Sequence, residues 1–240
     1  MQKPSQSMLR ILLLSLAALF LASPVLLFGW CYDPSGITPQ YSSIFQPGTR
    51  QVTNSRQAIL EGRAYCLEVD DSAAVLSACD GSTVIPSWQS PESWQVQEGF
   101  FADLNRDGTT EAVLLVRRPF APWPIDRFLP SGGRIAEFHD KAGYSLHVIL
   151  ITLRENEFKE AWAGSALVQP IRQLSAADLD GDGYEELAAL EYQYDRSPHK
   201  AALVVWHWNG FGFSLGARQP GNFSTLNVLN NQQGTWLVTN

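Results

Sequence analysis

The sequence predicts an all-β protein of antiparallel β repeats that follow one apolar segment near the N-terminus. Aromatic residues make up 11% of the 240 residues whereas there are only two Met, and aromatic side chains are enriched in strands. Outside the N-terminal segment, apolar residues show little helical periodicity. Two stretches of the chain also repeat each other, with an acidic loop at the same place in each.

The N-terminal region contains a long apolar segment without charge. Lys3 and Arg10 precede residues 11–30, which read ILLLSLAALFLASPVLLFGW. About 20 apolar residues span the hydrocarbon core of a bilayer, and basic residues on the N-terminal side favour an N-terminus inside the cell. We therefore expect a cytoplasmic tail at 1–10, a single transmembrane anchor at 11–30 in the cell membrane and an extracytoplasmic remainder. A cleaved signal peptide and lipidation of Cys31 are the alternatives.

Residues 31–55 are expected to form a stalk between the anchor and the exported domain. They contain Pro34, Pro39 and Pro47 and many Ser, Thr and Gln, a composition typical of linkers. The exported β-repeat domain then spans 56–240, and a short helix near 55–62 is considered at its start.

Export permits disulfide bonds, and the domain holds one pair of cysteines suited to form one. Cys66 and Cys79 bracket LEVDDSAAVLSA, which reads as a β-hairpin. If Asp71–Ala74 make the turn, Cys66 lies opposite Cys79, where cross-strand Cβ atoms are close enough to bridge. The alternative is two buried thiols, and Cys31 is left unpaired.

The repeat is visible as ungapped alignments. VQEGFFADLNRDGTTEAVLLV at 96–116 aligns with IRQLSAADLDGDGYEELAALE at 171–191, 75 positions later, as from 103 to 178. LITLRENEF at 150–158 aligns with VWHWNGFGF at 205–213, only 55 positions later. The difference of 20 positions places an insertion in the first copy, within 117–145.

Each acidic loop follows the pattern D-x-[DN]-x-D-G-x-x-E. Side-chain oxygens at positions 1, 3, 5 and 9, with a backbone carbonyl at position 7, can surround one cation, and this density of hard oxygens selects Ca²⁺. The glycine at position 6 permits the sharp turn. The predicted ligands of two Ca²⁺ ions are Asp103, Asn105, Asp107, the carbonyl of Thr109 and Glu111 in the first loop, and Asp178, Asp180, Asp182, the carbonyl of Tyr184 and Glu186 in the second. Glu185 has no role in this scheme and is expected to point away.

An EF-hand begins with the same spacing but is excluded here. Its loop requires Glu at position 12 and a helix on each side. Position 12 is Leu114 in the first loop and Ala189 in the second, and both loops run into apolar strand-like segments.

The two loops and the segments after them resemble the FG-GAP and VCBS repeats of integrin-like β-propellers. The resemblance covers two copies within residues 96–213 and includes the tryptophan-rich hairpin VVWHWNGFGF. It implies a propeller in which the loop between neighbouring strands of a blade binds Ca²⁺ through the ligands named above. Glu111 and Glu186 stand where the family more usually has Asp, and about 55 residues per unit leave room for fewer than four units. The expected fold is therefore a small or partial propeller, closed alone or by a partner.

The insertion is the predicted place for recognition. The formal charge of −7 argues against nucleic-acid binding, which needs a basic face. Long loops on a rigid scaffold often carry binding. The insertion gathers positive charge and aromatic rings, which suit a protein or glycan partner: Arg117, Arg118, Phe120, Trp123, Arg127 and Arg134. The alternative is a surface loop that packs its own aromatic side chains.

Catalytic patterns are weak. His139-Asp140 suggests acid–base chemistry, but His147, His199 and His207 lie in or beside predicted strands and complete no triad or zinc site. We therefore expect a Ca²⁺-binding protein that acts in binding or scaffolding rather than an enzyme. An accessory subunit of a larger membrane complex is the main alternative, and an enzyme acting on glycans is a further one.

Overall fold

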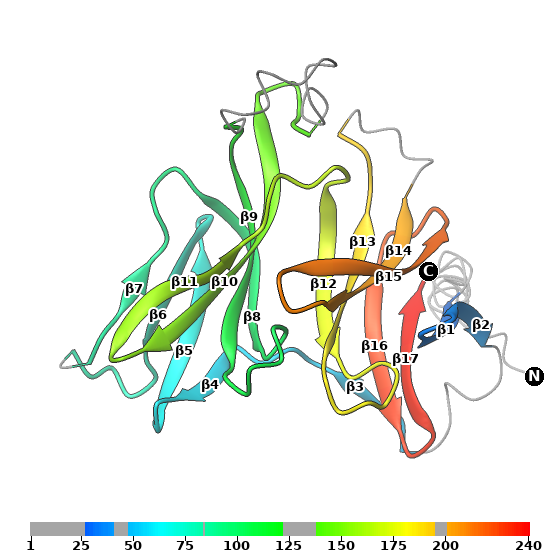
Figure 1. Ribbon diagram of the computed structural model, residues 1–240, viewed down its shortest axis with the longest axis horizontal. Coiled ribbons are helices and arrows are strands. Elements are labelled where there is room, and N and C mark those ends of the chain that lie inside the picture. The colour runs from blue at the N-terminus through cyan, green and yellow to red at the C-terminus, as the bar shows by residue number, and fades with distance from the viewer. Residues whose placement is uncertain (1–26, 41–47, 84, 122–137, 195–200) are drawn as a thin grey trace, which may run out of the picture.

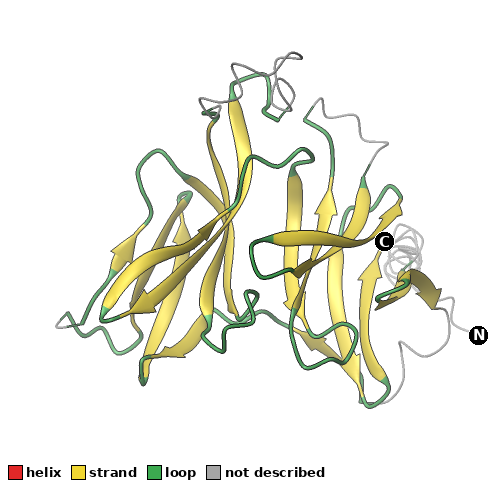
Figure 2. Ribbon diagram, viewed as in Figure 1, coloured by secondary structure: helices red, strands yellow, loops and turns green. Residues whose placement is uncertain are grey.

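The computed structural model describes residues 27–40, 48–83, 85–121, 138–194 and 201–240. Within these ranges the chain forms strands and loops and no helix (Figure 2). None of the described residues belongs to a helix that is long and apolar enough to cross a membrane. The all-β prediction is confirmed for this part of the chain, and the predicted tail and most of the predicted anchor lie outside it.

The strands form four antiparallel sheets in a four-bladed propeller arrangement (Figure 1). Blades 1 to 3 each consist of four strands that are consecutive in the chain. Blade 1 contains β4 (Gln57–Leu60), β5 (Arg63–Asp70), β6 (Ala73–Ala78) and β7 (Trp88–Gln89). Blade 2 contains β8 (Gln95–Ala102), β9 (Glu111–Pro119), β10 (Tyr144–Arg154) and β11 (Glu157–Ala163). Blade 3 contains β12 (Ile171–Ala177), β13 (Glu186–Glu191), β14 (Ala202–Trp208) and β15 (Phe213–Pro220).

Blade 4 is assembled from both ends of the described chain, in the order β2-β1-β17-β16-β3. The C-terminal hairpin of β16 (Leu226–Asn231) and β17 (Gly234–Thr239) lies at its centre. β1 (Phe28–Asp33) pairs with β17 and continues to β2 (Gly36–Gln40), while β3 (Arg50–Val52) pairs with β16. The early strands are thereby held to the last ones by sheet hydrogen bonds.

Blade 4 corrects two predicted boundaries. The segment 31–55 is not a stalk, because half of β1 and all of β2 and β3 lie within it. The prediction was wrong because the prolines were taken as typical of a linker. Pro39 instead lies in β2 at the edge of the sheet, where a missing N–H is tolerated. The anchor predicted for 11–30 also extends too far, because residues 28–30 pair with β17 and Trp30 is buried.

Two further predictions, the number of repeat units and the helix at the start of the domain, also differ from the structure. The estimate of fewer than four units was too low, because blade 1 is short and blade 4 recruits strands that precede it. The helix considered near 55–62 is wrong: β4 lies there and a tight turn at Glu61-Gly62, with φ of 46° and 77°, leads into β5. Cleavage before Cys31, which lipidation would require, would remove Trp30 and its hydrogen bond of 2.8 Å to Thr239 Oγ1.

The segment between β3 and β4 carries the chain from blade 4 back to blade 1. Asn54 donates its side-chain N–H to the carbonyl of Ala176 and accepts the hydroxyl of Ser175, both at 2.8 Å. Ser55 forms a bridge with Phe101 of β8. This segment therefore touches the first strands of blades 3 and 2 on its way and helps to hold the arrangement together.

Three apolar cores lie between successive blades. In β9, Val113 and Leu115 enter the core between blades 2 and 3, while the alternate residues Ala112 and Leu114 enter the core between blades 1 and 2. Because successive side chains of a strand point to opposite faces, a strand covered on both faces is apolar throughout. The same reason applies to β13. Its Leu187 and Ala189 enter the core between blades 2 and 3, and its Ala188 and Leu190 enter the core between blades 3 and 4.

The disulfide between Cys66 and Cys79 is present, with a Cα–Cα distance of 5.0 Å. Its geometry differs from the prediction, because the hairpin turn is shorter. Asp70 pairs with Ala73, so the turn is Asp71-Ser72, with φ of 45° and 68°. Cys66 is then opposite Ser77 rather than Cys79, and the disulfide joins two residues that are diagonal neighbours across the hairpin.

The repeat appears as structure in blades 2 and 3. The alignment at 75 positions superposes β8 and β9 on β12 and β13, and the alignment at 55 positions superposes the following hairpins. The hairpin turns differ, because Arg154 pairs with Glu157 in blade 2 whereas Trp208 pairs with Phe213 in blade 3. The predicted insertion lies between β9 and β10, and its residues 122–137 are outside the described ranges.

Candidate metal centre

Both acidic loops lie at the same end of the molecule, at the bottom of Figure 1. The first joins β8 to β9 and the second joins β12 to β13. The flanking register is identical, since Ala102 pairs with Glu111 and Ala177 pairs with Glu186. The ninth residue of each loop is therefore the first residue of the next strand, and the sheet fixes its position.

The backbones of the two loops follow the same path. Positions 4 and 6 have positive φ in both loops: 61° at Arg106, 81° at Gly108, 81° at Gly181 and 88° at Gly183. Glycine adopts this conformation without a steric penalty, whereas other residues are disfavoured by roughly 1–2 kcal/mol. Arg106 is therefore strained at the position where the second loop has glycine.

Carboxylates at positions 1 and 5 close each loop by accepting backbone N–H groups. Gly108 N–H donates to Asp103 Oδ2 at 2.9 Å, and Gly183 N–H donates to Asp178 Oδ2 at 3.1 Å. Each position-5 carboxylate accepts the N–H of the residue two places later at 2.8 Å. The aspartates therefore shape the loops on their own, which is a structural role independent of any ion.

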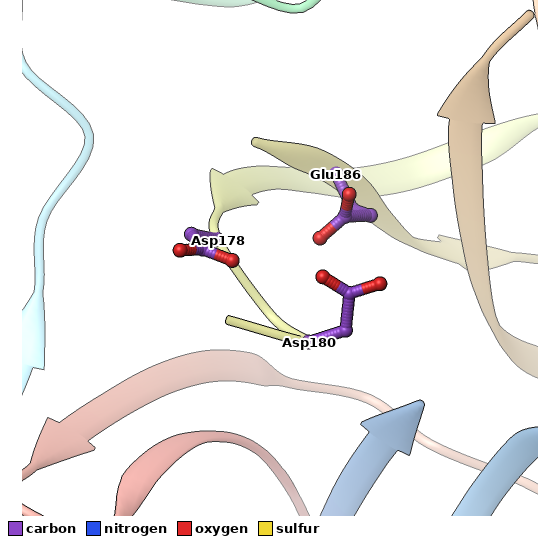
Figure 3. A group of neighbouring side chains, drawn as sticks. All are labelled: Asp178, Asp180 and Glu186. Carbon is purple, nitrogen blue, oxygen red and sulfur yellow. The ribbon is translucent and has the colours of Figure 1, made fainter. Parts of the chain in front are cut away.

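In the second loop three carboxylates converge. Asp178, Asp180 and Glu186 each offer an oxygen, and these oxygens lie within 4.8 Å of one another (Figure 3). Asp182, also predicted as a ligand, is not in this group; its Oδ2 faces Arg106 at 3.5 Å. The carbonyl role of Tyr184, like that of Thr109 in the first loop, stays a prediction.

In the first loop the buried carboxylate is Glu111, whose side chain has an exposed fraction of 0%. Asn105 Nδ2 donates to Glu111 Oε1 at 3.0 Å, but Glu111 Oε2 has no hydrogen-bond partner. Burial, with the charges of Asp107 and Asp103 added, raises the pKa of Glu111 to about 8. A buried carboxyl oxygen without a partner is costly, so this loop is incomplete as it stands.

In the second loop the equivalent residue, Glu186, is satisfied. Its Oε2 accepts the N–H of Leu179 at 3.0 Å, and its Oε1 accepts Arg106 Nη2 at 2.8 Å. Burial is the main cause that raises the pKa of Glu186, to about 7, and the charges of Asp180 and Asp182 act in the same direction.

Two contacts join the loops to each other. Arg106 reaches from the first loop to Glu186 in the second. In the opposite direction, Glu185 Oε2 accepts the N–H of Asp103 at 3.0 Å, and burial raises the pKa of Glu185. Glu185 was expected to have no role; it instead caps the start of the neighbouring loop.

The described part of the insertion is held by internal contacts. Arg117 forms an ion pair of 2.6 Å with Asp140 and lies 4.0 Å from the centroid of the Tyr144 ring. Arg118 lies near His147 Nδ1 at 3.4 Å, and the Phe120 ring stacks 5.0 Å from that of His139. These three predicted binding residues therefore have structural partners. Trp123, Arg127 and Arg134 lie outside the described residues.

Two of the histidines considered for catalysis, His139 and His147, also have structural partners. Burial acts to raise the pKa of Asp140, beside His139, but the hydrogen bond from Arg117 and those from the N–H groups of Tyr144 and Ala142 outweigh it and lower this pKa. His147 Nδ1 lies 2.9 Å from the Gly164 carbonyl, and its Nε2 lies 2.8 Å from Ser145 Oγ. Ser145 and His147 are both buried, so this pair is not positioned to meet a substrate.

Two arginines beside the candidate metal ligands were not singled out from the sequence. Arg106 and Arg154 each face the position-5 aspartate of a loop, Asp182 and Asp107 respectively. The sequence contained one indication of the role of Arg106, because a charged residue stands there where the aligned loop has Gly181. The sequence contained no such indication for Arg154, because this residue is brought to Asp107 only by the pairing of β10 with β9.

No family model, curated protein or solved structure matches this chain.

Proposed function

We propose that this protein is an exported, membrane-anchored β-propeller that binds two Ca²⁺ ions and acts in binding or scaffolding. The observation that carries the proposal is the buried Glu111, whose Oε2 has no partner and whose neighbours Asp103 and Asp107 are also acidic. A divalent cation would supply the missing partner and neutralise the three carboxylates together.

The donor set fits Ca²⁺ in both loops. Oxygens bind Ca²⁺ at about 2.3–2.6 Å, so two ligands on opposite sides of the ion are roughly 5 Å apart. The separation of at most 4.8 Å among the oxygens of Asp178, Asp180 and Glu186 suits a single ion between them. In the first loop the ion would take Asp103, Asp107 and Glu111, with Asn105 turning its amide oxygen inward. No sulfur or nitrogen ligand is present among these side chains, which favours Ca²⁺ over softer metals.

Bound Ca²⁺ would act on the fold rather than on a substrate. Glu111 begins β9 and Glu186 begins β13, and both strands lie between two apolar cores. An ion held by each residue would fix the loop to the start of a central strand. Metal binding of this kind contributes directly to the free energy of unfolding.

Three further observations support the wider proposal. The disulfide between Cys66 and Cys79 suits an oxidising compartment. A membrane anchor must end before Phe28, which leaves residues 11–27, seventeen in number (27 − 11 + 1), near the lower end of the roughly 17–25 that span a bilayer. The propeller arrangement and the paired loops agree with the resemblance to FG-GAP and VCBS repeats.

The role in recognition is assigned to the insertion between β9 and β10. Because Arg117, Arg118 and Phe120 have internal partners, the residues that remain for a protein or glycan are Trp123, Arg127 and Arg134. The accessory-subunit alternative stays a second proposal, and the four sheets formed by this chain favour it less than the predicted count of fewer than four units did.

The test is the melting temperature of the full-length protein, purified in mild detergent, with Ca²⁺ and with chelator. Calcium at one hundred times its Kd stabilises by about 2.7 kcal/mol per site, which raises the melting temperature by roughly 10–20 °C if both loops fill. The Glu111→Gln/Glu186→Gln double variant should lose this shift. Equal melting temperatures in calcium and in chelator, with no heat of Ca²⁺ binding, would overturn the proposal.

A further inference from the structure

The side chain of Arg106 reaches from the first loop into the second. Its backbone lies between Asn105 and Asp107, at position 4 of the first loop, with φ of 61°. Its Nη2 is 2.8 Å from Glu186 Oε1, its Nη1 is 3.5 Å from Asp182 Oδ2, and its guanidinium lies 4.8 Å from the centroid of the Tyr184 ring. The positive charge of the guanidinium therefore sits against two of the predicted ligands of the second loop.

This position conflicts with a metal ion in the same loop. Glu186 is the buried member of the converging carboxylates, with an exposed fraction of 1%. Both of its oxygens are engaged, one by Leu179 N–H and one by Arg106. A Ca²⁺ ion bound to Glu186 would lie within a few ångströms of the guanidinium, where like charges repel strongly at the reduced dielectric of a partly buried site.

Arg106 can leave its position more easily than a buried side chain. Its side chain has an exposed fraction of 25%, and its Nε–H is buried without a hydrogen-bond partner. Moving the guanidinium into water would hydrate this group, which offsets part of the cost of breaking the ion pair.

The first loop has no equivalent obstacle. Arg154, which faces that loop, has an exposed fraction of 57% and contacts Asp107. Glu111 receives only the amide of Asn105, and its Oε2 stays open. The two loops therefore differ in the position of the arginine: Arg154 lies at the exposed rim of the first loop, whereas Arg106 reaches the buried carboxylate of the second.

We propose that Arg106 is a tethered competitor of Ca²⁺ in the second loop. The inference rests on the proposed function, because it presumes that both loops bind Ca²⁺. In this scheme the first loop binds more tightly, although it has one carboxylate fewer. The second loop fills at higher Ca²⁺ concentration, and its filling requires Arg106 to leave Glu186.

The test is calorimetric titration with CaCl₂ of the full-length protein in mild detergent. Glu111→Gln weakens Ca²⁺ binding in the first loop, so in this background the measured heat of Ca²⁺ binding comes from the second loop. Arg106→Gln in that background should strengthen Ca²⁺ binding by about tenfold or more. Arg106→Gly is the second variant, since glycine occupies the same position of the aligned loop with the same sign of φ. Arg63→Gln removes the same charge from the exposed surface of blade 1 and should change the affinity by less than about twofold.

The outcomes separate this inference from the proposed function. If both Arg106 variants leave the affinity of the second loop unchanged or lower it, while wild-type protein binds two ions, then Arg106 is not a competitor and the inference is wrong. If wild-type protein and both variants bind no Ca²⁺, the proposed function fails as well.

Discussion

The two acidic loops share one backbone but differ in how their buried glutamates are satisfied. Both loops have positive φ at positions 4 and 6 and the same carboxylate-to-backbone bonds. Glu186 nevertheless has a partner on each oxygen, whereas Glu111 Oε2 has none. The difference comes from Arg106, which the first loop contributes to the second. The repeated motif therefore determines the backbone shape of each loop, whereas a side chain from the neighbouring blade determines whether a positive charge lies beside the buried glutamate.

The largest effects should come from replacing the two glutamates separately. Glu111→Gln and Glu186→Gln should each weaken Ca²⁺ binding in their own loop by about 100-fold or more, because each removes a ligand charge. In chelator the two should differ: Glu186→Gln should lose about 1–2 kcal/mol with its ion pair, and Glu111→Gln less than about 1 kcal/mol. Calorimetry and denaturant unfolding measure both quantities. Equal losses of stability in chelator would mean that the loops do not differ as described.

The free energy of unfolding should also depend on pH through His147, which lies in neither loop, so this dependence has to be measured separately. Burial lowers the pKa of His147 to about 4, and the charge of Arg118 acts in the same direction. The unfolded chain, with a histidine pKa near 6.5, binds the proton first, so stability falls as the pH drops from 6.5 towards 4. The loss should reach about 2 kcal/mol by pH 5.

His147→Asn keeps an N–H group for the Gly164 carbonyl and removes the titrating ring. The difference in unfolding free energy between wild type and this variant should therefore shrink by about 2 kcal/mol between pH 7 and pH 5. A difference that stays constant over this range would show that folding does not lower the pKa of His147.

A smaller effect tests the strain at position 4. No atom lies within 4 Å of a Cβ built on Gly181, so substitution there reports the backbone alone. Gly181→Ala should lower the free energy of unfolding by about 1 kcal/mol, and Gly181→Asn by roughly half as much, because Asn tolerates positive φ better. Thermal unfolding in chelator measures both. If Ala and Asn behave alike, the left-handed conformation is not the source of the cost, and Arg106 is not strained either.

The smallest effect concerns the second contact between the loops. Glu185→Gln keeps a side-chain oxygen that can accept the N–H of Asp103 but removes its charge, so we expect a loss of about 0.5 kcal/mol. Hydrogen exchange at the Asp103 amide should be modestly faster in the variant. Unchanged exchange at this amide would argue that Glu185 does not cap the first loop.

The sequence predicted the repeated elements well because they are local. Loop spacing, the glycine at position 6 and the apolar runs after Glu111 and Glu186 depend on neighbouring residues. Blade 4 was missed because its strands come from opposite ends of the chain, and the prolines before β3 resembled a linker. Arg106 was missed for a similar reason: its partners Asp182 and Glu186 lie in another blade, and nothing local indicates which way a long side chain points.

A crystal structure of the full-length protein, grown with Ca²⁺ well above its Kd, would show directly whether the two loops bind Ca²⁺ and where Arg106 then lies. We expect one ion in each loop, bound through Glu111 in the first and through Asp178, Asp180 and Glu186 in the second, with the Arg106 guanidinium moved away from Glu186. Loops without ions, with Arg106 still bound to Glu186 and Glu111 Oε2 still without a partner, would contradict it.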